Sequence, residues 1–276
     1  MNDHKKKLRD VLEKTNAETM LPVVKISLKV PTEDEPELEL TDSKFSGTPY
    51  IPHDEEAPVS GSGTPLVLLA QMDLSKIKGH GGLPKKGLLQ FFIADSEDYG
   101  ISDEEGYAVR YYPEIDKTVT EDECSEKYCP EISGNFPVQM EYKLEFENAE
   151  EPMTVFDYRF DGEFTKNYNA AFPEKKISCI ADLDDGDMEF LFGDDDDDTD
   201  EGQPAEHKLL GYPIFDQEDP RNGTEYEKYD RLLFMTDCDM SEYIMFGDGG
   251  GACFFISSEK LKNADFSDIM YTWDCF

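Results

Sequence analysis

Apolar residues fall into short runs along this chain, and most runs have the length and pattern of β-strands. Residues 66–72 and 88–93 are almost entirely apolar, which is typical of strands buried on both faces. Residues 138–146 alternate between apolar and polar side chains, so one face of that strand should be buried and the other wet. Further strands are predicted at residues 23–30 and 107–112 and, on a weaker pattern, at 155–160.

Helical patterns are few and short. Residues 3–20 carry a thin apolar stripe, and Asp3 can cap the first turn. We expect this helix to lie on the surface of the body. Single helical turns are expected after Asp73 and around residues 259–261. The sum predicts a mainly β, α+β fold with a few short helices, without the βαβ alternation of a doubly wound sheet.

Three blocks of sequence occur twice in the same order. Matching positions are 164 residues apart in the first block, 166 in the second and 163 in the third. This near-constant offset indicates an internal duplication with a much longer period than solenoid repeats have. We therefore expect an N-terminal surface helix over residues 1–20 and a single domain over 21–276. Its two similar halves, about 43–100 and 207–263, should build roll-like sheets. The blocks are residues 43–49 and 207–213, 66–73 and 232–239, and 87–93 and 250–256.

The chain is strongly acidic, with 63 Asp and Glu against 26 Lys and Arg and a formal net charge of −37. Such a charge repels phosphate backbones, so we expect no nucleic-acid partner. A basic protein would be attracted over a long range, whereas the plainer interpretation is that acidity keeps the protein soluble. Residues 182–206 contain thirteen acids and no Lys or Arg, and we expect a mobile loop there.

The cysteines and the N-terminus favour a cytoplasmic protein. None of the six cysteines has the two-residue spacing of common zinc sites, so free thiols in a reducing cytosol are expected. No apolar segment follows the initial charges, and no run is long enough to cross a bilayer, so no membrane partner is expected. The acids from Asp196 onward resemble the start of an EF-hand loop. Glu201 and His207 break that template, so we expect no metal and no cofactor.

Paired carboxylates are the first candidates for chemistry. Asp237 and Asp239 are two positions apart at the end of a predicted strand, and Asp73 lies at the end of the matching strand in the first copy. Carboxylates held close together shift each other's pKa and suit acid–base work. The alternative is that they cap the turns that follow each strand.

Three further candidates lie near the C-terminus. Asp248 stands in the glycine run 247–251, which either binds an anion through its backbone or makes a tight turn before a strand. Trp273 and Asp274 either anchor a partner or pack against the body.

A further candidate lies in the first half of the chain. The lysine-rich loop 76–86 either holds an anion or is a solvated basic turn. No catalytic motif is assembled, so no catalytic residue is predicted.

The blocks together resemble the YwqG-like family, a bacterial family of unknown function. The resemblance rests on residues 43–52, which read Ser-Lys-Phe-Ser-Gly-Thr-Pro-Tyr-Ile-Pro, and on the later motifs listed below. It covers most of residues 20–276 and implies a mainly β, roll-like fold without an established reaction. The acidic insert near 194–201 has a longer run of acids than the family pattern. Members resemble, by genomic company, immunity proteins of toxin systems. The later motifs are 65–73, 83–92, 207–213, 232–239, 245–256 and 273–274.

Two functions from different classes remain open. The first is a non-enzymatic binding protein that neutralises a basic protein, such as a toxin domain, through its acidic surface. The alternative is an enzyme or small-ligand-binding protein with a carboxylate-lined cleft between the two halves.

Overall fold

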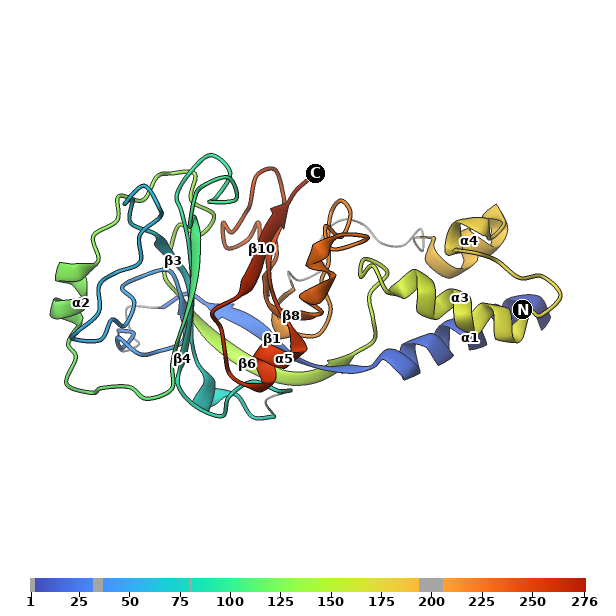
Figure 1. The fold of residues 1–276 in the computed structure, drawn as a ribbon, viewed down its shortest axis with the longest axis horizontal. Coiled ribbons are helices and arrows are strands. Elements are labelled where there is room, and N and C mark those ends of the chain that lie inside the picture. The colour runs from blue at the N-terminus through green and yellow to red at the C-terminus, as the bar shows by residue number, and fades with distance from the viewer. Residues whose placement is uncertain (1–2, 32–36, 80, 194–205) are drawn as a thin grey trace.

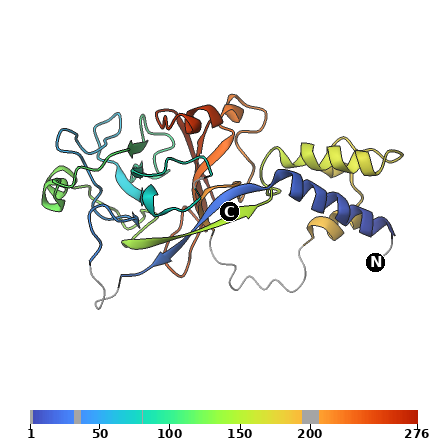
Figure 2. The ribbon, with the colours of Figure 1, turned by 90° about the horizontal axis from the view of Figure 1, so that it is seen from below.

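The computed structural model describes residues 3–31, 37–79, 81–193 and 206–276. These residues form a ten-stranded antiparallel sheet and five helices, so the predicted mainly β, α+β fold is confirmed. The sheet rolls into a nearly closed barrel, and a helical lobe stands beside it (Figures 1 and 2). The strands are β1 (Leu21–Lys29), β2 (Lys44–Phe45), β3 (Val67–Asp73), β4 (Leu88–Ile93), β5 (Tyr107–Tyr112), β6 (Tyr142–Glu151), β7 (His207–Leu210), β8 (Arg231–Thr236), β9 (Gly251–Ile256) and β10 (Ile269–Asp274); the α-helices are α1 (Asp3–Thr19), α2 (Glu121–Lys127), α3 (Phe160–Ala171), α4 (Asp185–Phe192) and α5 (Ser258–Lys262), and the 3₁₀ turns are η1 (Leu74–Lys76), η2 (Ile180–Asp182) and η3 (Glu225–Lys228).

The sheet places the two copies on opposite sides of a central strand pair. Its order is β10-β9-β8-β7-β1-β6-β2-β3-β4-β5, with β1 and β6 paired along their whole length. Strands β2, β3 and β4 come from the first copy and β7, β8 and β9 from the second, and β5 and β10 follow the two copies along the chain. Each copy and the strand after it therefore form a run of four neighbouring strands, and both runs start next to the central pair.

Each half carries one β-bulge, and the bulges fix how the copies correspond. The pairing of β3 with β4 skips Leu69, and the pairing of β8 with β9 skips Leu233. These residues are 164 positions apart, so Asp73 corresponds to Asp237. The offset of 166, which matches Asp73 to Asp239, is wrong by two positions. Strands β3 and β8 are both runs of similar apolar residues, so a comparison of the sequences alone fits almost equally well when one strand is shifted by two positions.

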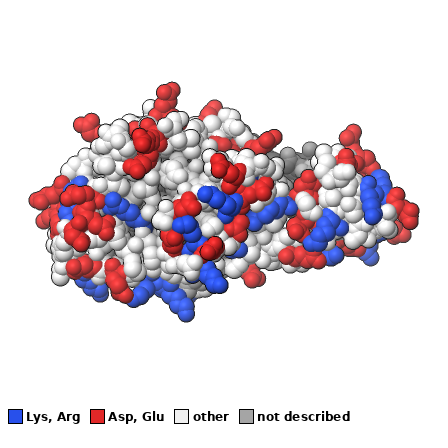
Figure 3. Space-filling model, viewed as in Figure 1, with Lys and Arg blue, Asp and Glu red and all other residues white. Residues whose placement is uncertain are grey.

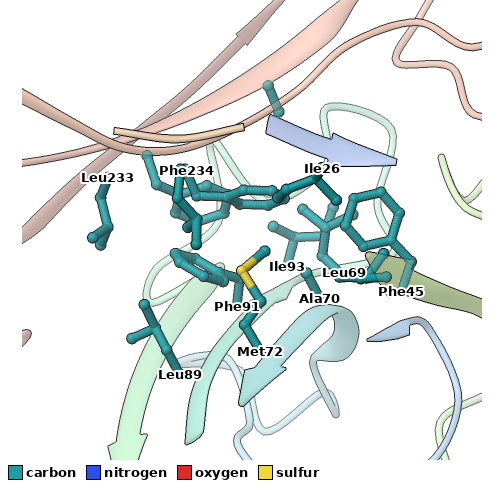
Figure 4. Close-up of a cluster of buried hydrophobic side chains, with 14 of the residues drawn as sticks. Ile26, Phe45, Leu69, Ala70, Met72, Leu89, Phe91, Ile93, Leu233 and Phe234 are labelled. Carbon is teal, nitrogen blue, oxygen red and sulfur yellow. The ribbon is translucent and has the colours of Figure 1, made fainter. Parts of the chain in front are cut away.

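The interior of the barrel is filled by side chains from both copies. Figure 4 shows Phe91 and Phe234 pointing toward each other from opposite walls, and their ring centroids are 4.7 Å apart. The edge strands β5 and β10 meet through side chains. The Tyr107 hydroxyl donates to the Ile269 carbonyl at 2.9 Å, and its ring lies 5.2 Å from that of Tyr271. Aromatic side chains therefore close the barrel along this seam.

The helical lobe corrects several predictions. The strand expected at residues 155–160 is wrong, because residues 155–159 form turns and Phe160 begins α3, whose buried stripe is Phe160, Phe164 and Tyr168. Helix α1 packs against α3 and α4 rather than on the sheet. The acidic segment is helical over α4, and its residues 194–205 lie outside the described part of the chain. The strand expected at 138–146 begins later, at β6.

Candidate binding groove

A groove of about 670 Å³ lies where loops of the two copies meet. One wall is the segment after β4, the second is the connection before β6, and the third is the loop between β8 and β9. The lining residues are Asp95, Ser96, Glu97, Tyr99, Ser133, Gly134, Asn135, Phe136, Pro137, Gln139, Met240, Tyr243, Ile244, Met245 and Gly247.

Hydrogen bonds hold the first two walls together. Strand β4 ends at Ile93 and delivers Asp95 to the rim. The Asp95 carboxylate accepts from the Ser133 backbone N–H and from its hydroxyl, the latter at 2.7 Å. The side-chain amide of Gln139 donates to the carbonyl of Phe136. These bonds fix a segment that has no regular secondary structure.

The third wall is a loop closed at its base. The Asp239 N–H donates to the Ile244 carbonyl at 2.8 Å, and the Ile244 N–H donates back to the Asp239 carbonyl at 3.0 Å. The Nε2 atom of the His207 imidazole lies 3.9 Å from Oδ2 of Asp239. This imidazole, together with hydrogen bonds from Ser241 and from the Glu242 N–H, holds the pKa of the Asp239 carboxyl below its usual range. Burial opposes this effect and raises the pKa. Asp239 therefore shapes the loop and does not line the groove.

Large apolar side chains stand exposed around this groove. Met240 is 72% exposed, Tyr243 is 73% exposed and Met245 is 38% exposed, whereas Phe136 forms a buried floor. Two carboxylates, Asp95 and Glu97, are among the lining residues, and no Lys, Arg or His of the described chain is. Exposed apolar groups with a polar rim are typical of sites that bind another protein.

Two of the predicted site residues come together away from the groove. Asp237 and Asp274 lie near Asp216, which the sequence analysis did not single out. Burial, and then the charge of Asp237, raise the pKa of the Asp274 carboxyl. Desolvation and the charges of Asp274 and Asp237 raise the pKa of Asp216 in the same way. The Asp274 carboxylate also accepts a hydrogen bond from the backbone N–H of Gln217 at 2.9 Å.

The other two predicted residues lie apart from this cluster. Trp273 is partly buried, stacks edge-on against Tyr99 with centroids 4.9 Å apart, and donates its indole N–H to the Asp98 carbonyl at 2.8 Å. It thus ties β10 to the loop that forms one wall of the groove. Asp248 is exposed in the tight turn between Phe246 and Gly250, whose backbones exchange two hydrogen bonds.

The lysine-rich loop lies at the opposite end of the barrel from the groove. Strand β3 runs into this loop and β4 leaves it, so the far end of β4 delivers Asp95 to the groove. Lys76, Lys78 and Lys85 are exposed there. In Figure 3, basic side chains gather at the lower edge of the larger lobe, and acidic side chains are spread over both lobes.

The described residues contain no group of three or more His, Cys, Asp or Glu placed to hold a metal ion. All six cysteines are free thiols. None of the helices in the described part of the chain has the length and apolar character needed to cross a bilayer.

Sequence reasoning missed the groove because its three walls are far apart along the chain. The available signal was Met240, Tyr243 and Met245, which interrupt a polar turn between two strands. Large apolar residues in a loop have no strand or helix to bury them, and that pattern marks an exposed patch.

Comparison with known families gives one match. The model described as Domain of unknown function (DUF1963) matches residues 43–275, so the chain belongs to this family. No curated protein matches the chain. The expected membership of an uncharacterised family is confirmed, and the YwqG-like label stays a prediction.

Proposed function

We propose that this DUF1963 protein is a non-enzymatic binding protein of the cytosol that takes a basic protein partner in the groove. The observation that carries the proposal is the set of exposed side chains Met240, Tyr243 and Met245 around a hollow of about 670 Å³. Burying such side chains against a partner removes apolar surface from water, and methionine adapts its shape to different partners.

Charge supports a basic partner. Among the residues that the structure places, no cationic side chain lines the groove, and the whole chain carries a net charge of −37. This field would accelerate the approach of a basic surface and disfavour an acidic one. The neutralisation of a basic toxin, which the YwqG-like resemblance suggests, is one form of this function.

The test combines capture with a matched pair of variants. A basic protein captured from native lysate would be purified and titrated against the wild type, the Met240→Ser/Tyr243→Ser variant and a control. Truncating two central side chains should weaken binding at least about tenfold. The control, Val155→Ser/Phe156→Ser, removes residues that are 53% and 42% exposed and lie outside the groove, so affinity should be unchanged.

Salt provides the second readout. Affinity for the wild type should fall between low and physiological ionic strength, because exposed charges are screened. A basic partner that binds the groove variant as tightly as the wild type would overturn the proposal.

A further inference from the structure

The lining of the groove includes both an unpaired carboxylate and an exposed aromatic ring. The two carboxylates of the groove differ in their hydrogen bonds. Asp95 accepts two hydrogen bonds from Ser133, whereas Glu97 is exposed and makes no hydrogen bond or ion pair within the described chain. Tyr243 is 73% exposed, and its hydroxyl has no partner among the described residues. A free anion and a free π-face thus border one hollow.

The loop constrains the backbone of Tyr243. Its φ is +53°, in the left-handed region that costs a residue with a side chain about 1–2 kcal/mol. The reciprocal bonds between Asp239 and Ile244 close the loop around it. Residues kept in such a conformation tend to lie at binding sites, where the surrounding structure imposes it. The backbone position from which the Tyr243 ring projects is therefore set before any partner arrives.

These features distinguish between the two long basic side chains. A guanidinium is planar and weakly hydrated, stacks on aromatic faces and pairs with a carboxylate through two N–H groups. A lysine ammonium is compact and strongly hydrated, so it loses more by entering a hollow floored by Phe136 and flanked by Met240. The combination of ring, thioether and single free carboxylate fits arginine better.

We infer that the partner residue entering the groove is an arginine, stacked on Tyr243 and paired with Glu97. This inference rests on the proposed function, since it names the chemistry of the partner at the same site.

The experiment uses two labelled peptides of equal length, charge and apolar content, one rich in arginine and the other in lysine. Their binding to the full chain would be followed by fluorescence anisotropy. The arginine peptide should bind about tenfold more tightly to the wild type, from the range of cation–π energies in partly desolvated sites. Tyr243→Leu keeps the apolar bulk and removes the π-face, so the preference should shrink to the part that Glu97 supplies. Glu97→Gln should weaken the arginine peptide more than the lysine peptide.

Control variants separate the two claims. Tyr226→Leu removes a tyrosine that is 44% exposed on η3, outside the groove, and should leave both affinities unchanged. Equal binding of the two peptides, both weakened by Met240→Ser, would overturn the arginine inference and leave groove docking standing. Binding that no groove variant alters would overturn both, and binding of neither peptide would overturn the arginine inference.

Discussion

Replacing Arg221 with methionine tests the most deeply buried charge cluster of the protein. The Arg221 side chain is fully buried and lies at the root of the helical lobe. It donates to the Asp219 carboxylate at 2.9 and 2.6 Å and to Asp157 at 3.1 Å, and its guanidinium carbon lies 4.1 Å from the centre of the Phe255 ring. Methionine keeps most of the apolar stem and removes the charge.

The expected loss in the free energy of unfolding depends on which carboxylates the Arg221→Met substitution leaves without a cation. Asp157 keeps Arg159, which donates to it at 2.7 and 2.6 Å, but Asp219 loses its only cation and keeps two backbone donors, the N–H of Tyr158 and the N–H of residue 221. Stranding a buried carboxylate costs about 3–5 kcal/mol. Urea unfolding followed by circular dichroism should therefore give a free energy of unfolding lower by that amount at neutral pH. The Arg221→Met/Asp219→Asn variant, which removes the stranded charge, should be more stable than the single variant.

The loss should also shrink in acid. Burial by itself raises the pKa of Asp157, but the hydrogen bonds and charge of Arg159 and the charge of Arg221 hold it below its usual range. A lowered pKa stabilises the fold above the unfolded value of about 4, and this stabilisation is lost as the pH falls through the folded value. Removing Arg221 takes away one of the charges that lower the pKa of Asp157, so the difference in stability between the two proteins should shrink as the pH falls below about 4. A loss under about 1 kcal/mol, or a double variant less stable than the single one, would refute this reasoning.

Two further changes probe the seam and the carboxylate cluster. Tyr107→Phe removes the hydroxyl that donates to Ile269, so the free energy of unfolding should fall by about 0.5–1.5 kcal/mol in urea titrations; an unchanged value would mean that the aromatic contacts alone hold the seam. Asp274→Asn should raise stability at neutral pH, because a raised folded pKa makes the ionised carboxyl destabilising as the pH rises through that pKa, while the asparagine oxygen still accepts from Gln217. The gain should be absent below about pH 4, the unfolded pKa of aspartate, and a gain equal at both pH values would contradict this explanation.

Local patterns predicted most strands and missed the features that depend on distant contacts. The apolar runs of β3, β4, β8 and β9 are buried on both faces, so their hydrophobicity alone identifies them. Asp73 caps η1 as its sequence suggests, accepting from the Ser75 N–H at 2.9 Å. Helix α3 was missed although its aromatic residues recur every four positions.

The groove could not be predicted from any single segment of the sequence. Asp95, Ser133 and Met245 are far apart in sequence, and the rolled sheet brings them to one end of the barrel. The cluster of Asp216 with Asp274 has the same origin, because it joins the chain after β7 to the end of β10. Carboxylates that look alike in sequence thus acquire different roles from tertiary contacts.

The lysine loop and the groove loop occupy corresponding places in the two copies, yet one is cationic and the other apolar with an anionic rim. Because the loops lie at opposite ends of the barrel, the exposed lysines of one loop are remote from the groove that the other loop borders. The two copies have therefore diverged so that no lysine of the corresponding loop weakens the electrostatic potential that Asp95 and Glu97 create at the groove.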